Sequence, residues 1–225
     1  MQKKQPQPAG RFRIPPYVLW VGALMVLSQL ACYYLTRLLL PGRTLHILTI
    51  PLDARIPLSS PWITVYFLSF PFWIGTGLWI LLESKPHAYR VGMAYALAML
   101  LSAAVFQIWP GTMERPEIAG TGFFDRLMIL LYRIDSPTNL CPSLHVLATY
   151  FCWRGEMGCQ KVPGWYRVFS FLFLLAVCAS ILLVKQHALI DIPAGILTGE
   201  TALQCARLCR LERIPYAAER YFTER

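Results

Sequence analysis

The sequence predicts an all-α, polytopic membrane protein whose six transmembrane helices form a helical bundle. Of its 225 residues, 56% are hydrophobic and only 15% are charged, and the mean hydropathy is +0.46. A soluble domain of this size cannot bury so much apolar surface. In a bilayer the lipid surrounds apolar side chains, and helices satisfy the backbone hydrogen bonds internally. The composition therefore favours one membrane-embedded domain.

The membrane segments are expected at six places along the chain. A span needs about 20 apolar residues, and four segments meet that length: residues 17–40, 61–83, 88–109 and 165–184. Two shorter segments, 142–153 and 187–208, each begin with polar residues. Polar groups inside a span are costly unless they serve a function. These two segments are therefore the most informative in the chain.

Two long connections separate the spans. Residues 41–60 are rich in proline and turn-forming residues, and we expect a loop there with a short interfacial helix. Residues 110–141 contain the segment FFDRLMILLYRID, whose apolar side chains recur at helical spacing. These side chains are Phe124, Leu127, Met128 and Leu131. The segment is predicted to be an amphipathic helix lying along the membrane interface.

The termini are expected to be cytoplasmic tails, at residues 1–16 and 209–225, on either side of the membrane domain at 17–208. With six spans, 14 of the 21 lysines and arginines lie on the side of the termini and 7 on the other side. Cytoplasmic loops carry the excess of basic residues. Topology thus explains the net charge of +9 better than nucleic-acid binding does. The expected location is the plasma membrane of a bacterium, with both long loops outside the cytoplasm; in a eukaryote these loops would face the secretory lumen.

Three polar groups fall on the outer side of this topology. The first is E-R-P at 114–116, the second is C-P-S-L-H at 141–145, and the third is K-Q-H-A-L-I-D at 185–191. They are far apart in sequence but share one membrane depth. Two of the four histidines, His145 and His187, stand here at the mouths of membrane helices. The three groups are predicted to form one site.

His187 and Asp191 are spaced i, i+4, which would bring both side chains to one face of a helix. A carboxylate at that position accepts the imidazole N–H, fixes the tautomer and leaves the other nitrogen as a lone-pair donor. This arrangement predicts that His187 is a nucleophile. The alternative is a helix-start histidine that pairs with an aspartate only for local stability.

The segment Pro142-Ser143-Leu144-His145 has the form of a helix beginning, where exposed N–H groups favour a bound anion. His145 would then be the general acid for the departing alkoxide. Alternatively, Ser143 only caps the helix and His145 reaches toward lipid headgroups. Arg115 and Lys185 add two cations near the same anion, and guanidinium donors suit phosphate oxygens. Each of these cations could instead be a headgroup anchor.

Metal-ligand spacing is absent from the sequence around these residues. The cysteines are scattered in or near apolar segments, without a CxxC or a Cys/His cluster, and are interpreted as small hydrophobes. Two cations, helix N–H groups and two histidines would then stabilise the transferred group. The sequence therefore predicts a metal-independent site with no cofactor.

Taken together, the three motifs resemble the type 2 phosphatidic acid phosphatase and vanadium haloperoxidase superfamily over roughly residues 105–200. The resemblance implies a six-helix core and a phosphohistidine formed on His187. It implies that His145 protonates the leaving group and that Asp191 orients His187. It also implies that Arg115, Ser143 and Lys185 hold the phosphate.

Two cations of the family pattern are replaced in this chain. The lysine expected seven residues before Arg115 is Ile108, and the arginine expected six residues before His187 is Ile181. Lys185, two residues before His187, would replace one of them. P-S-L-H, with leucine at 144 where glycine is usual, together with K-Q-H-x-x-x-D, resembles the branch of inositol phosphorylceramide and sphingomyelin synthases. Those enzymes transfer a phospho-alcohol headgroup.

The leading expectation is a lipid phosphate phosphatase that hydrolyses a phosphomonoester or pyrophosphate of a phospholipid or isoprenoid. A phosphotransferase that moves a phospho-alcohol headgroup between lipids is the alternative within enzymes. A non-catalytic lipid-binding or transport protein is the alternative of another class, and the two missing cations favour it slightly. The expected partner is a membrane lipid, and no nucleic acid is expected.

Overall fold

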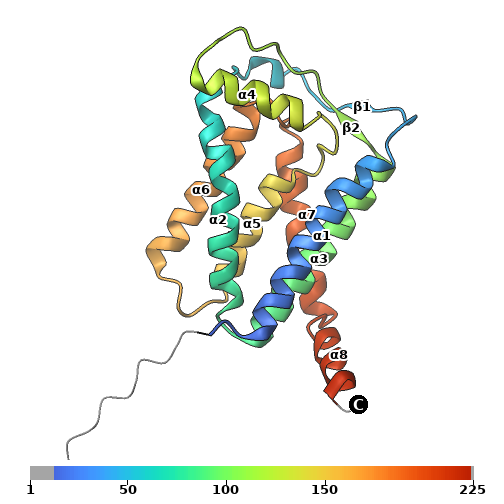
Figure 1. Cartoon of the computed structure of the whole chain (residues 1–225), viewed down its shortest axis with the longest axis vertical. Helices are drawn as coiled ribbons and strands as arrows, with labels where there is room; N and C mark the ends of the chain where they lie inside the picture. Colours follow the sequence, from blue (N-terminus) through green and yellow to red (C-terminus); the bar gives the residue numbers. More distant parts are fainter. Residues whose placement is uncertain (1–12, 224–225) are drawn as a thin grey trace, which may run out of the picture.

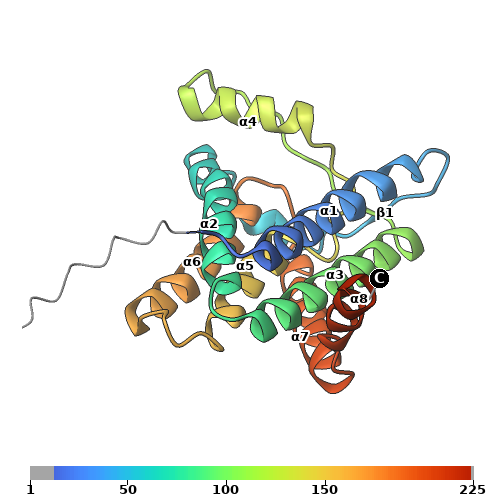
Figure 2. The same ribbon diagram turned by 60° about the horizontal axis from the view of Figure 1, so that its bottom comes forward.

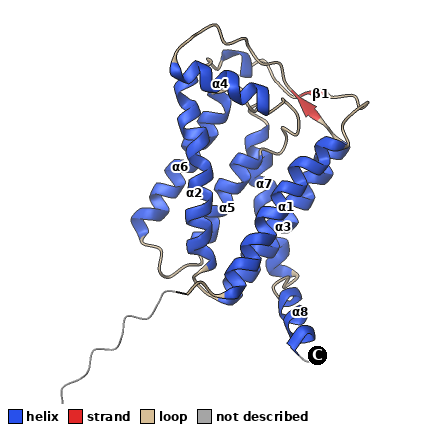
Figure 3. Ribbon diagram, in the orientation of Figure 1, coloured by secondary structure: helices blue, strands red, loops and turns tan. Residues whose placement is uncertain are grey.

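The computed structural model describes residues 13–223, which fold almost entirely as helices (Figures 1 and 3). The α-helices of this part of the chain are α1 (Pro16–Leu38), α2 (Ile63–Leu81), α3 (Lys85–Ile108), α4 (Phe123–Ile134), α5 (Leu144–Glu156), α6 (Gly164–Leu183), α7 (Asp191–Leu208) and α8 (Arg213–Thr223). Two short 3₁₀ helices, η1 (Asp53–Arg55) and η2 (Ser60–Trp62), precede α2. The all-α prediction is confirmed, apart from two strands of two residues each in the loops.

Four segments of the described chain are long and apolar enough to cross a membrane, which is typical of an integral membrane protein. They are α1, the segment Ser60–Leu81, α3 and α6. The prediction of six apolar spans is corrected to four. Helix α5 has only 13 residues, about 20 Å of helix against a hydrocarbon core of about 30 Å. Helix α7 has 18 residues but carries Asp191, Glu200 and Arg207, so its hydropathy is too low.

The helices α1, α2, α3, α5, α6 and α7 run alternately up and down the bundle (Figure 1). The first described residues and α8 therefore lie at the same end, and α4 crosses the opposite end. Helix α1 lies along α3, which contacts α7 on its other side (Figure 2). The short helix α5 contacts α2, α6 and α7, and most of its side chains are buried. Polar side chains at its start are thereby enclosed by protein.

The two long loops meet at the end of the bundle that carries α4. Strand β1 (His46–Ile47) pairs in parallel with β2 (Gly111–Thr112), and Thr112 also bridges to Thr138. The helix predicted in the second loop is confirmed as α4, which buries Met128 and Leu131. The first loop contains η1, and a longer interfacial helix is absent from its described residues.

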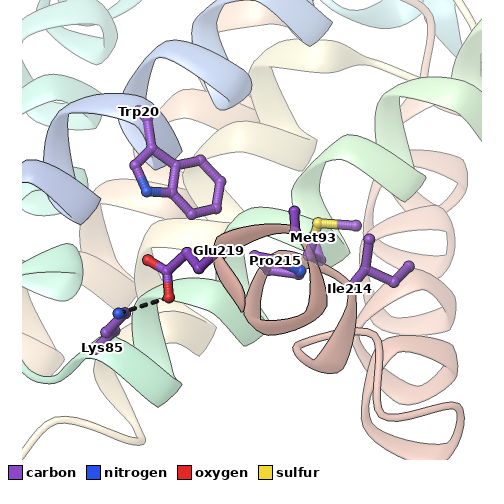
Figure 4. A pocket seen from close by; sticks show the side chains of 7 residues that line it. Trp20, Lys85, Met93, Ile214, Pro215 and Glu219 are labelled. Atoms are coloured by element: carbon purple, nitrogen blue, oxygen red, sulfur yellow. Dashed lines mark ion pairs between the residues drawn. The ribbon is translucent and has the colours of Figure 1, made fainter. Parts of the chain in front are cut away.

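The segment after α7 is folded as helix α8, against the start of α3. Lys85 Nζ lies 2.7 Å from a carboxylate oxygen of Glu219 (Figure 4). A cavity of about 720 Å³ lies beside this ion pair, and Trp20, Met93 and Ile214 are among its lining residues. Residues 209–223 thus form a turn and a docked helix where a tail was expected. Residues 1–12 of the predicted N-terminal tail lie outside the described residues.

Candidate functional site

The starts of α5 and α7 touch each other, and this contact brings the two histidines together. The backbone N–H of Ser143 donates to the carbonyl of Asp191 at 3.2 Å, and both residues are fully buried. One turn into α7, a Cβ on Gly195 would lie 2.9 Å from the carbonyl oxygen of Ser143. Glycine therefore permits this close crossing. As a result, the ring centroids of His145 and His187 lie 6.0 Å apart at an angle of 62°.

His187 lies in the turn between α6 and α7, because α7 begins only at Asp191. The expectation that both residues share one face of a helix is therefore wrong, but the pair still forms. Nδ1 of His187 lies 3.1 Å from Oδ2 of Asp191 and 3.0 Å from the carbonyl oxygen of Leu140. The same Oδ2 accepts the N–H of Ala188 at 2.9 Å, which holds the turn together.

The tautomer of His187 follows from these two neighbours. A carboxylate and a carbonyl are both acceptors, so Nδ1 carries the proton. The lone pair of the neutral ring is then on Nε2. The side chain of His187 is 8% exposed, so only a small part of the ring is open to solvent. This is the arrangement that a histidine nucleophile requires.

The loop that supplies the Leu140 carbonyl is fastened to α1. Asn139 has a positive φ of 56°, and its amide donates to Thr36 Oγ1 at 2.8 Å and to the carbonyl of Tyr33 at 3.2 Å. Cys141 lies beside the carboxylate of Asp191, and burial together with this charge raises the pKa of its thiol to about 12. Cys141 is therefore protonated and is not a nucleophile.

His145 is the second residue of α5, and its ring packs against three aromatic side chains of α2. The ring centroids of Tyr66, Trp73 and Phe70 lie 4.2, 5.2 and 5.6 Å from that of His145. Its Nε2 is buried and has no hydrogen-bond partner within the described chain. Ser143 caps α5, because its hydroxyl oxygen accepts the N–H of Val146 at 3.4 Å. The ring of His145 is therefore packed against α2, with Nε2 buried and unpaired within the described chain.

Arg115 links the loop before α4 to the residue that precedes His187. Its Nη2 donates to Oε1 of Gln186 at 2.6 Å, and its Nη1 donates to the carbonyl of Asp135. The guanidinium carbon lies 4.7 Å from the centroid of Tyr132, whose hydroxyl donates to the carbonyl of Val184 at 3.0 Å. Burial lowers the pKa of Arg115, which still leaves this guanidinium charged. It is a positive charge held by hydrogen bonds to Asp135 and to Gln186, the residue before His187.

Asp135 completes a closed ring of contacts, although no sequence motif marks it as a site residue. Its carboxylate accepts hydrogen bonds from the hydroxyls of Tyr33 and Tyr66 and lies 3.4 Å from Arg37 Nη1. Tyr66 in turn packs on His145, and the carbonyl of Asp135 holds Arg115. The only sequence signal for it was an aspartate at the end of an amphipathic segment. Its three partners lie far away in the chain, so their convergence could not be predicted.

Lys185 is used differently from what the sequence suggested. It adopts a positive φ of 52°, and its Nζ donates to the backbone carbonyls of Asp53 and Ile56 at 3.0 and 2.6 Å. Oδ1 of Asp53 accepts the N–H of Leu189 at 2.8 Å. These hydrogen bonds attach η1 to the turn that contains His187. Burial lowers the pKa of the Lys185 ammonium.

Ile108 and Ile181 stand where the phosphatase-like sequence pattern has cations, and neither side chain takes part in the contacts around Asp135 and Arg115. Ile108 is 77% exposed at the end of α3, and Ile181 is buried in an apolar cluster with Val146 and Val177. Within residues 13–223, no three His, Cys, Asp or Glu side chains gather closely enough to hold a metal ion. The donors present are two imidazoles, a guanidinium and an amide, which suit acid–base chemistry on an anionic group.

Comparison of the chain with protein-family models, with curated proteins and with solved structures finds no match. The residues of the site therefore carry the functional argument by themselves. Sequence reasoning found His145, His187, Asp191 and Arg115, which the structure brings together. No motif predicted Gln186, which lies between Lys185 and His187 in the sequence and is only 2% exposed.

Proposed function

We propose that the protein is an integral membrane lipid phosphate phosphatase that works through a phosphohistidine on His187. The observation that carries the proposal is the double hydrogen bond of Nδ1 to Asp191 and to the Leu140 carbonyl. It leaves Nε2 as the nucleophilic nitrogen, with a second histidine ring 6.0 Å away and the half-buried Arg115 hydrogen-bonded to the preceding residue, Gln186. A histidine that only stabilised a helix start would not need this surrounding.

The reaction follows from the positions of these groups. Nε2 of His187 attacks phosphorus, and the bond between phosphorus and the lipid oxygen breaks. His145 receives a proton with the anionic substrate and gives it to the departing alkoxide. Asp191 stabilises the positive charge that develops on His187, and Arg115 stabilises the phosphoryl oxygens. Water then attacks the phosphohistidine and loses a proton to His145, which releases inorganic phosphate and restores both histidines.

The fold is suited to a substrate held in a bilayer. The apolar helices α1, α2, α3 and α6 expose large side chains such as Leu27, Ile74 and Leu172. Helices α5 and α7 complete six traverses of the bundle; protein surrounds α5, and polar helix starts are tolerated where protein encloses them. By the distribution of basic residues, the site faces away from the cytoplasm.

The test measures phosphate release from a panel of labelled lipid phosphates by the purified protein. His187→Ala removes the nucleophile, and we expect release to fall by roughly 10³-fold or more. His46→Ala is the matched control, because His46 lies at the same end of the bundle but stacks on Trp109 at 4.4 Å. Release by His187→Ala at the wild-type rate would show that the site is not catalytic. Adding an alcohol acceptor distinguishes hydrolysis from transfer, because transfer yields a new phosphodiester.

A further inference from the structure

The side-chain amide of Gln186 has one polar atom that is hydrogen-bonded and one that has no partner in the described chain. Its Oε1 accepts from Nη2 of Arg115 at 2.6 Å. A guanidinium offers only donors, so the amide oxygen must accept from Arg115, and the amide nitrogen is left as a donor that does not bond to it. Nε2 of Gln186 is buried and donates to no acceptor within residues 13–223. The orientation of the amide is thus determined by the arginine.

Arg115, the donor of this hydrogen bond, also has one buried nitrogen without a partner among the described residues. Its two terminal nitrogens are engaged with Asp135 and Gln186, whereas its Nε is buried and without a partner in the described chain. Buried N–H groups are nearly always hydrogen-bonded, because an unpaired donor is costly. Arg115 and Gln186 are hydrogen-bonded to each other, and each keeps one donor, Nε and Nε2 respectively, that is unpaired within the described chain. Two such donors on neighbouring side chains indicate a site for a ligand with several acceptor oxygens.

The neighbouring charges determine what kind of ligand suits these donors. The carboxylate nearest to Arg115, that of Asp135, is already engaged by Tyr33, Tyr66 and Arg37. The guanidinium therefore has no ion-pair partner among the described carboxylates. An anion is favoured over a cation or a neutral alcohol. Since Gln186 directly precedes His187, the anion would lie beside the nucleophile.

We propose that Gln186 is a substrate-binding residue whose Nε2, together with Nε of Arg115, donates hydrogen bonds to the phosphoryl oxygens of the transferred group. This inference rests on the proposed phosphatase function. It assigns to a neutral amide a contact that the sequence had suggested for Lys185, whose ammonium is bound to backbone carbonyls. A phosphate monoester has enough oxygens to accept from both donors at once.

The experiment compares the binding of orthovanadate and of inorganic phosphate, as inhibitors of lipid phosphate hydrolysis, by the full-length protein and two variants. Gln186→Glu keeps the size of the side chain and still accepts from Arg115, but it loses the donor and adds a negative charge. Gln186→Met removes the donor, and with it the acceptor of Arg115, without adding charge. One lost hydrogen bond to a charged ligand weakens binding roughly 10- to 100-fold. We expect losses in this range for Gln186→Met and larger losses for Gln186→Glu.

Gln107→Glu is the matched control. Gln107 also accepts from an arginine, Arg43, at 3.2 Å, but its Nε2 already donates to the carbonyl of Thr36 at 3.0 Å. The control therefore loses an equivalent donor that is not free for a ligand, and its vanadate affinity should equal that of the wild type. Thermal unfolding of each variant, measured without ligand, separates a binding defect from a folding defect.

The possible outcomes are distinguishable. Suppose that the wild type hydrolyses lipid phosphates and binds vanadate. If either folded Gln186 variant then binds vanadate as tightly as the wild type, Gln186 does not have the proposed phosphate-binding role. A loss of equal size in Gln107→Glu would also overturn it. If the wild type neither binds vanadate or phosphate nor releases phosphate, the proposed function itself fails, whatever the variants do.

Discussion

The proton on Nδ1 of His187 determines the chemistry of the site at the scale of single residues. Asp191 is one acceptor for this proton, and the carbonyl of Leu140 is the other. Two acceptors make the orientation of the ring less sensitive to the loss of either one. In the proposed reaction the charge of Asp191 has a further role, because a carboxylate stabilises a cationic phosphohistidine more strongly than a carbonyl does.

Asp191→Asn is therefore expected to lower the rate without abolishing it. The amide keeps the shape of the side chain and the Leu140 carbonyl still holds Nδ1, but the negative charge is lost. We expect kcat to fall roughly 10²-fold, with KM changed by less than about threefold. Steady-state kinetics on a labelled lipid phosphate measure both.

Asp125→Asn is the control for this substitution. Asp125 lies in the first turn of α4, where it accepts hydrogen bonds from Ser60 and from the N–H of Gly122. Its neutralisation should leave kcat unchanged. If Asp191→Asn keeps kcat within twofold of the wild type, Asp191 has no part in the reaction.

Lys185 is a single residue whose side chain holds a whole element, η1, in place. Its ammonium fastens η1 to the turn of His187 through two carbonyls. We expect Lys185→Met to speed amide hydrogen exchange in residues 184–190, while vanadate affinity stays within about threefold of the wild type. Lys161→Met, at an exposed lysine in the loop before α6, should change neither property. Loss of vanadate affinity at unchanged exchange would instead make Lys185 a phosphate contact.

The crossing of α5 and α7 positions the two histidines at the scale of elements. A methyl group on Gly195 would meet the backbone oxygen of Ser143 at 2.9 Å and Cβ of Val146 at 3.3 Å. A backbone atom cannot rotate away as a side chain can. The helices must therefore separate to accommodate the methyl group, which also separates His145 from His187.

Gly195→Ala is accordingly expected to destabilise the protein by about 1–3 kcal/mol and to lower phosphate release. Thermal unfolding in detergent and the lipid phosphatase assay measure the two effects. Gly77→Ala in α2 is the control, because a Cβ at Gly77 meets nothing within 4 Å. That variant should be as stable as the wild type or slightly more stable. Equal stability of the two variants would contradict the close crossing.

In the whole molecule, the start of α1 and helix α8 lie at one end of the bundle, and the starts of α5 and α7, which carry the site, lie at the other (Figure 1). Cys209, just after α7, is exposed at the end that carries α8, whereas Ala119 is exposed in the loop before α4. The distribution of basic residues predicts that the end of the bundle that carries α8 is cytoplasmic. The two positions are therefore expected to report on opposite sides of the membrane.

A membrane-impermeant maleimide measures this orientation in intact cells. We expect Ala119→Cys to be labelled from outside above the background of the native cysteines. Cys209 should be labelled only after permeabilisation, and Cys209→Ser should remove that signal. Labelling of Cys209 in intact cells would place the site on the cytoplasmic side and overturn the predicted topology.

Much of the fold could be predicted from the sequence because helix length and hydropathy are local properties. Helices α1, α3 and α6 begin and end within about three residues of the expected limits, and α4 was expected from its apolar spacing. The number of apolar spans was overestimated, because α5 and α7 are too short or too polar to be recognised as spans by composition. Helix α8 was missed because its docking depends on pairs such as Lys85–Glu219, which are distant in sequence.

Composition and the three motifs are enough to predict the class of the protein and the residue types of the site, including both histidines, Asp191 and Arg115. The folded chain is needed to show which nitrogen of His187 is free, how the amide of Gln186 is oriented and what holds Lys185. The reason is that these answers depend on backbone carbonyls, those of Leu140, Asp53 and Ile56 among them. Every residue has a carbonyl, so no sequence pattern indicates which one lies near a given side chain.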